Sequence, residues 1–258
     1  MSLPNILAAA RPTGSGFVAT IPDDWMQGRT SYGGLSAALG LVAAQKLADD
    51  LPPLRSATVS FVGPLAGEVE VSARMLRRGR NATWISAEVV QDGAVGLSAT
   101  FVFMGPVEQS QLHLHDVPAP ANVIPLAEAA PLPQRAGPSF APNFERRFAL
   151  PKTEEPEPVV CWWERLRDAQ GLDPMVSLLL LADALPPGVM PLTGPAPISS
   201  MNWLINMLTA KPQTDDGWFL LRAVGNYAEK GCSSQDMAIW NTNGEAVAVG
   251  MQSIAIFG

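Results

Sequence analysis

Residues 30–50, TSYGGLSAALGLVAAQKLADD, decide how we interpret the fold of this chain. The apolar positions of this stretch cover every face of a helix with 3.6 residues per turn, and Lys46 is its only charge before the last two residues. A helix at the surface of a protein has a polar side, whereas a helix that is apolar all round is buried. We therefore predict a buried central helix around which a sheet folds, with Gly33 and Gly34 in its first turn.

The composition of the chain predicts a large core and argues against several partners. Of the 258 residues, 47% are hydrophobic and 16% are charged, and the net charge is −7. An acidic chain lacks the positive field that binds phosphates, so we expect no nucleic-acid partner. Two cysteines cannot form a disulfide framework, and no apolar run approaches the roughly 20 residues that span a bilayer. The first residues show no signal-peptide pattern, so we expect a soluble, cytoplasmic protein.

Strand-like segments surround the predicted helix. A short apolar run at 16–21 precedes it, and Pro52-Pro53 ends it. Four alternating segments follow, and the last two flank Asp92-Gly93, a dipeptide typical of hairpin turns. These segments are 55–62, 67–76, 83–90 and 95–104.

Residues 105–158 form a proline-rich segment with little periodicity. Eleven of the 24 prolines lie within it. We expect a long connection that crosses the surface and contains few ordered pieces, one of them at 143–150.

The second half of the chain repeats the order of the first half. Asp173-Pro174 is a typical N-cap and first helical residue, and a second, nearly all-apolar helix follows at 175–185. Pro186-Pro187 ends this helix, and Asn243-Gly244 takes the place that Asp92-Gly93 has in the first half. The other segments, predicted as strands, are 159–166, 199–208, 218–226, 234–241 and 246–257.

This order predicts a duplicated module of one helix and one antiparallel sheet. The N-terminal repeat is expected at 1–105, the proline-rich connection at 106–158 and the C-terminal repeat at 159–258. A buried helix wrapped by an antiparallel sheet, present twice in one chain, resembles the hotdog fold in its fused double form. We therefore expect an α+β double hotdog in which two antiparallel sheets each wrap around a long central helix.

Several segments resemble the acyl-CoA thioesterase II family and its thioesterase-like relatives. They keep the order and spacing of that family and span nearly the whole chain, with the connection matching least. The segments are 29–34 (RTSYGG), 54–65 (LRSATVSFVGPL), 200–203 (SMNW), 216–221 (DGWFLL) and 243–253 (NGEAVAVGMQS). The resemblance implies that activated water hydrolyses a fatty acyl-CoA thioester without a metal or other cofactor, as part of fatty acid metabolism. It also implies an acyl-CoA ligand and a homo-oligomer.

The resemblance implies three catalytic positions. The family has an Asp early in the strand after the second helix, a hydroxyl residue after the Trp-containing strand and a Gln in the last strand. Asn202, Asn226 and Gln252 occupy these positions here, so only Gln252 matches. An Asn amide orients water by hydrogen bonds but cannot take its proton, and a positioned general base contributes about 10²–10⁴ in rate.

The start of the first helix supplies the candidate substrate contacts, Tyr32, Gly33 and Gly34. The backbone N–H groups of the two glycines, with the helix dipole behind them, are candidate donors to an oxyanion.

Two functions therefore stay open. One is a thioesterase, fast or slow, whose water is held by Asn202, Asn226 and Gln252. The other is a non-catalytic acyl-CoA or acyl-chain binding protein with the same fold. A hotdog hydratase is less favoured, because it requires a His–Asp pair and both histidines, His113 and His115, lie in the connection.

Other reactive side chains have simpler explanations. Asp183, within the second apolar helix, is a candidate for a displaced base, but such a residue more often caps a helix or pairs locally. His113 and His115 are expected to be solvated, so we expect no metal site. Cys232 lacks a nearby His that would activate it as a nucleophile.

Overall fold

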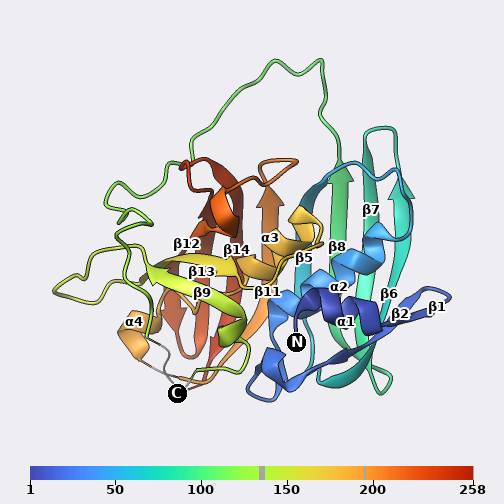
Figure 1. Cartoon of the computed structure of the whole chain (residues 1–258), viewed down its shortest axis with the longest axis horizontal. Helices are drawn as coiled ribbons and strands as arrows, with labels where there is room; N and C mark the ends of the chain where they lie inside the picture. Colours follow the sequence, from blue (N-terminus) through green and yellow to red (C-terminus); the bar gives the residue numbers. More distant parts are fainter. Residues whose placement is uncertain (134–136, 195, 258) are drawn as a thin grey trace.

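The computed structural model describes residues 1–133, 137–194 and 196–257. The strands of these residues form one continuous antiparallel sheet of 12 strands and a separate two-stranded ribbon (Figure 1). The order in the large sheet is β1-β2-β6-β7-β8-β5-β11-β14-β13-β12-β10-β9. N-terminal strands therefore make up one half of the sheet and C-terminal strands the other, and β5 and β11 join the two halves.

The N-terminal half confirms the predicted helix and strands. Asp92 and Gly93 have φ angles of 50° and 78°, as a tight hairpin turn requires. Its helices are α1 (Leu3–Ala9) and α2 (Gly33–Gln45), and Asp23–Trp25 forms a 3₁₀ turn. Its strands are β1 (Arg11–Thr13), β2 (Gly16–Ile21), β3 (Met26–Gln27), β4 (Thr30–Ser31), β5 (Leu54–Phe61), β6 (Gly67–Arg78), β7 (Ala82–Gln91) and β8 (Ala94–Met104).

The main elements of the C-terminal half have the same order as those of the N-terminal half: two strands of the large sheet, a buried helix and four further strands. Asp173 is the predicted N-cap of its main helix, because its Oδ1 accepts from the N–H groups of Met175 and Val176 at 3.0 and 3.1 Å. Its helices are α3 (Pro174–Ala182) and α4 (Met190–Thr193), with 3₁₀ turns at Ala141–Asn143 and Asp215–Gly217. Its strands are β9 (Phe144–Phe148), β10 (Val159–Leu166), β11 (Ile198–Met207), β12 (Phe219–Glu229), β13 (Cys232–Trp240) and β14 (Ala246–Ile256).

The expectation of two separate sheets is corrected by the pairing of β5 with β11. These strands pair antiparallel from Asn202 opposite Ser60 to Asn206 opposite Ser56. Each strand would otherwise be an edge with unpaired N–H and C=O groups, and each satisfies the groups of the other. The result is one sheet that curves past both helices (Figure 1).

Helices α2 and α3 lie against each other inside this sheet. Leu35, Leu39 and Leu41 of α2 are fully buried, as the all-apolar pattern predicts, and so are Leu178 and Leu180 of α3. Both helices belong to one apolar cluster with the inner face of the large sheet. None of the helices in the described ranges is long and apolar enough to cross a membrane.

The described part of the connection covers the outer face of the C-terminal strands. Two buried tryptophans of that face donate to backbone carbonyls of the connection: Trp163 Nε1 to Ile124 O at 2.9 Å and Trp240 Nε1 to Val117 O at 2.8 Å. Figure 1 shows this part of the chain as a green arch that leaves β8 and leads to β9. Its last part turns inward, where Phe140 and Phe144 pack on Tyr32.

Tyr32 fixes how the start of α2 meets the end of α3. Its buried hydroxyl donates to Leu180 O at 2.7 Å, and its ring stacks on Phe140 with centroids 4.2 Å apart. A Cβ on Gly34 would lie 2.6 Å from the same Leu180 carbonyl oxygen, so only glycine allows this approach.

We predict that Tyr32→Phe lowers the free energy of unfolding by about 1–3 kcal/mol, because the buried Leu180 carbonyl loses its donor. Denaturation in urea measures this change. Tyr227, the other tyrosine of the chain, is 53% exposed and provides the control. Tyr227→Phe should change the same free energy by no more than about 0.5 kcal/mol. Equal effects of the two substitutions would show that the hydroxyl of Tyr32 does not tie the helices together.

Candidate active site

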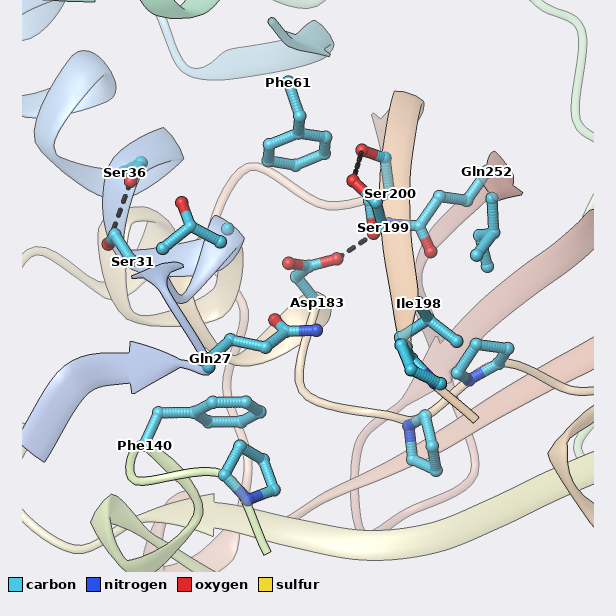
Figure 2. Close-up of a pocket in the computed structure, with 18 of the residues that line it drawn as sticks. Gln27, Ser31, Ser36, Phe61, Phe140, Asp183, Ile198, Ser199, Ser200 and Gln252 are labelled. Carbon is cyan, nitrogen blue, oxygen red and sulfur yellow. Dashed lines mark hydrogen bonds between the residues drawn. The ribbon is translucent and has the colours of Figure 1, made fainter. Parts of the chain in front are cut away.

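A cavity of about 1060 Å³ lies where α2, α3 and the junction of the two sheet halves meet. Its wall is largely apolar and aromatic, and it also carries polar side chains, with Ser31 and Ser36 on one side and Ser199, Ser200 and Gln252 on the other (Figure 2). The residues of the wall that matter for chemistry are Gly33 of α2, Phe61 of β5, Phe140 and Asp183 of the intervening loops, Ser200 of β11 and Gln252 of β14. In Figure 2, Asp183 lies between the start of α2 and the strand that carries Ser200.

Asp183 is the C-cap of α3 and presents its carboxyl group to the cavity. Oδ1 accepts from Gln252 Nε2 at 2.8 Å, and the backbone N–H of Gly34 also donates to the carboxyl group. Desolvation raises its pKa from 3.8 to about 7, and the two hydrogen bonds oppose that rise. A group with this pKa can accept and return a proton near neutral pH.

A β-bulge decides which side chains of β11 face the cavity. The pairing of β11 with β14 shifts register between Ser200 and Asn202, which makes Met201 an extra residue. Side chains alternate along a strand, and Trp203 is buried on the inner face. In a regular strand Met201 would share that face. Because of the bulge, Ser200 does so instead, while Asn202 faces outward.

Gln252 joins Asp183 to Ser200. Its Nε2 donates to Asp183 Oδ1 at 2.8 Å and to Ser200 Oγ at 3.0 Å, so both amide hydrogens are used within the protein. Its Oε1 accepts from Gln235 Nε2 at 2.9 Å. Since Ser200 Oγ accepts from Gln252, the hydroxyl hydrogen remains available as a donor to a ligand in the cavity.

Gly33 brings the start of α2 to the carboxyl group of Asp183. A Cβ at this position would lie 2.6 Å from Asp183 Oδ2 and 2.7 Å from Phe61 Cε1. The N–H groups of a first helical turn have no intrahelical partner, and they lie at the positive end of the helix dipole. The backbone of Gly33 can therefore donate to an oxygen bound in the cavity.

Of the catalytic and substrate-contact residues that the family resemblance implies, Gln252 and Gly33 line the cavity, together with Asp183, the candidate for a displaced base. Gly34 lies behind the wall, and its backbone N–H donates to the carboxyl group of Asp183. Tyr32 is also behind the wall, covered by Phe140, with its hydroxyl bonded to α3. Neither is placed to contact a ligand in this cavity.

Asn202 and Asn226 lie away from the cavity and from each other. Asn202 is on the outer face, where its Oδ1 accepts from Ser60 Oγ at 3.0 Å. Asn226 is exposed at a register shift of β12, and its Nδ2 donates to Asp236 Oδ2 at 3.2 Å. The structure therefore does not bring either amide together with Gln252.

Sequence reasoning undervalued Asp183 and missed Ser200. Asp183 does not pair locally as expected, because its partner Gln252 lies 69 residues away in the chain. One signal was present in the sequence. A lone carboxyl group at the end of an all-apolar helix is costly to bury, so it is expected to be hydrogen-bonded or to belong to a functional site. Nothing in the sequence marks the bulge that turns Ser200 inward.

We predict that Asp183→Asn stabilises the protein at alkaline pH. A carboxyl whose pKa is raised on folding favours the native state only while it is protonated, so stability is lost as pH rises from about 4 to about 7. The unfolding free energy of the variant should therefore exceed that of the wild type by an amount that grows across this window and then stays constant.

Urea denaturation between pH 4 and pH 9 measures the difference. Glu164, fully buried with a pKa of about 8, is present in both proteins, so its contribution cancels. Asp236→Asn, on the outer face of β13, is the control for the loss of one negative charge. A difference that does not depend on pH would contradict the raised pKa of Asp183.

Comparisons with known proteins agree with this architecture. A family model described as the acyl-CoA thioesterase N-terminal domain matches residues 21–104, and one described as the acyl-CoA thioesterase C-terminal domain matches residues 113–256. No curated protein matches the chain.

Several solved structures share the fold. A conserved protein of unknown function with a hotdog fold from Alicyclobacillus acidocaldarius is 22% identical, with a TM-score of 0.88 over 100% of this chain and 99% of that one. The tesB protein of Mycobacterium avium subs. paratuberculosis is 18% identical, with a TM-score of 0.80 and full coverage of both chains. The acyl-CoA thioesterase II TesB2 of Mycobacterium marinum is 18% identical, with a TM-score of 0.78 over 99% of this chain and 98% of that one. The fold is thus a hotdog fold, and because the C-terminal family model alone matches more than half of the sequence, the chain belongs to the acyl-CoA thioesterase family.

Proposed function

We propose that this protein hydrolyses acyl-CoA thioesters in the cavity beside α2 and α3, with Asp183 as the general base. The observation that carries the proposal is a carboxyl group on the cavity wall whose pKa is about 7 and which Gln252 holds by a hydrogen bond of 2.8 Å. The general base is thereby moved from the position of Asn202, where the family resemblance placed it, to Asp183. An Asn at position 202 then has no bearing on turnover.

The reaction needs only water and the thioester. The Asp183 carboxylate takes a proton from a water molecule as the water oxygen attacks the carbonyl carbon. The tetrahedral intermediate collapses with cleavage of the C–S bond, and the thiolate of CoA leaves. Protonated Asp183 returns the proton to that sulfur, so the products are a carboxylic acid and CoA, and Asp183 is again ionised.

Three neighbours of Asp183 have distinct roles in this proposal. Ser200 donates its free hydroxyl hydrogen to the water oxygen and holds it beside the carboxylate. The N–H of Gly33 donates to the carbonyl oxygen, where negative charge develops, and one such donor contributes about 10²–10³ in rate. Gln252 has no amide hydrogen left for the substrate, so it orients Asp183 and Ser200.

We also infer that the site forms between two hotdog repeats, at 1–105 and 159–258, linked by the connection at 106–158. The matching order of strands outward from β5 and from β11 supports this inference. Gly33 then comes from the first repeat, and Asp183, Ser200 and Gln252 from the second. Homo-oligomerisation and a cytoplasmic location stay predictions.

We predict that Asp183→Asn lowers kcat by about 10²–10⁴ while acyl-CoA binding persists, because the amide keeps the size of the side chain but cannot take a proton. In the wild type, kcat/KM should rise with pH and level off above an apparent pKa of about 7. Steady-state assays with short-, medium- and long-chain acyl-CoAs measure both effects, and calorimetry measures binding.

Asn202→Ala is the control for this experiment and should retain wild-type turnover. Loss of turnover in Asn202→Ala with retention in Asp183→Asn would refute the assignment of the base. Acyl-CoA binding by the wild type without any hydrolysis would instead establish the alternative function, a non-catalytic acyl-CoA binding protein.

We predict that Gly33→Ala lowers kcat/KM by about 10²-fold, because the added methyl group displaces Asp183 Oδ2 and the Phe61 ring. Gly40→Ala in the same helix is the matched control, since its new Cβ would have no neighbour nearer than 3.6 Å. That substitution should keep activity and raise the unfolding free energy by about 0.5–1 kcal/mol. Similar kinetics for the two variants would remove Gly33 from the site.

A further inference from the structure

A chain of side-chain amides runs from the cavity into the C-terminal half of the sheet. Gln235 on β13 lies directly opposite Gln252 on β14 in the antiparallel pairing. Gln235 Nε2 donates to Gln252 Oε1 at 2.9 Å, and Gln235 Oε1 accepts from the backbone N–H of Gly188 at 2.8 Å. Gln235 is only 1% exposed, and it is not among the described residues of the cavity wall.

The backbone N–H of Gly188 sets the direction of every bond in this chain. A backbone N–H can only donate, so the oxygen of Gln235 must face it and the NH₂ group of Gln235 must face Gln252. The oxygen of Gln252 must then face Gln235, and its NH₂ group must face Asp183 and Ser200. The amide of Gln252 therefore has one satisfied orientation.

Gly188, the last donor in this series of hydrogen bonds, is itself fixed by packing. A Cβ on Gly188 would lie 2.5 Å from Gly225 N and 2.9 Å from Ala223 O of β12. The backbone of Gly188 therefore lies directly against this strand, and it follows Asp183 by only five residues. Asp183, Gln252, Gln235 and Gly188 thus close a ring between the end of α3 and the sheet.

We infer that Gln235 is a positioning residue that holds the amide of Gln252 in the one orientation in which its NH₂ group serves Asp183 and Ser200. The kinetic consequences of this inference rest on the proposed function, whereas the orientation itself does not. Without Gln235, the Gln252 amide is free to turn by 180° and place its oxygen against the Asp183 carboxylate. Two acceptors would then face each other, which disfavours the ionised carboxyl and raises the pKa of Asp183.

Few other charges surround Asp183. Tyr32, from the start of α2, is buried nearby, and its pKa is raised first by desolvation and then by the charge of Asp183. Glu164 of β10 and Arg146 of β9 also act on Tyr32, and Arg29 lies on the cavity wall. None of these four side chains contacts Gln235 by a hydrogen bond or ion pair in the described residues, so a change confined to the glutamine chain leaves them in place.

The test is Gln235→Met, which keeps the length of the side chain and removes both hydrogen bonds. We expect kcat/KM to fall by about 10- to 100-fold, and the acid limb of its pH profile to move to higher pH by about half a unit to one unit. The matched control is Gln91→Met. Gln91 also accepts from a backbone N–H, that of Ala66 at 2.7 Å, but in the N-terminal half. This variant should keep the wild-type pH profile even if it lowers stability.

A double-mutant cycle separates orientation of Gln252 from a general loss of structure. In a Gln252→Ala background, Gln235→Met should have no further effect on kcat/KM or on the acid limb, because the amide that it orients is gone. Additive effects, or an unmoved acid limb in the single variant, would overturn the inference. If Gln235→Met does not fold, Gln235→Leu provides the same cycle, since it also removes both hydrogen bonds and adds no charge near Asp183.

A readout without turnover keeps the two proposals distinguishable. In Gln235→Met, the loss of stability with rising pH should extend to a higher pH than in the wild type, because the folded pKa of Asp183 is higher. This difference should vanish in the Asp183→Asn background. If the pH dependence of stability differs in this way but the protein hydrolyses no acyl-CoA, the inference about Gln235 is sustained and the proposed function is rejected. If the protein is active but its stability shows no such difference, the proposed function is sustained and the inference about Gln235 is rejected.

Discussion

The close contact between the start of α2 and the end of α3 is the constraint on which the rest of the structure depends. Gly34 admits the carbonyl oxygen of Leu180, and Tyr32 donates to that same oxygen. A side chain at Gly34, or at Gly33 beside Asp183, would separate the helices. This contact places unpaired N–H groups of one helix beside the carboxyl that caps the other, which offsets part of the cost of burying Asp183.

The joined sheet supplies the rest of the cavity wall. Pairing of β5 with β11 brings Phe61, which precedes the connection, to the same cavity as Ser200, which follows it. The bulge at Met201 then selects the side chain of β11 that faces inward. A cavity built in this way needs both halves of the chain, because neither half alone supplies its wall.

Buried amides give the site its rigidity. Gln252 and Gln235 are 4% and 1% exposed, and every amide hydrogen of Gln252 has an acceptor. A fully satisfied polar chain costs little to bury and permits only one arrangement, whereas an incomplete one would be destabilising. The pKa of Asp183 is the balance between desolvation, which raises it, and the donors of this chain and of Gly34, which lower it.

The sequence by itself determined the elements of this fold. The all-apolar stretches became α2 and α3, Asp173 became an N-cap, and the alternating segments with their Asp-Gly and Asn-Gly turns became strands and hairpins, because these features depend on neighbours within a few residues. Gln252 and Gly33 were also recognised, since the family resemblance is carried by their local motifs. Only the tertiary structure decided that the two sheets join, that Ser200 rather than Asn202 faces the cavity, and that Asp183 meets Gln252. Those outcomes depend on strand pairing, on a one-residue bulge and on contacts across 69 residues, none of which leaves a local pattern in the chain.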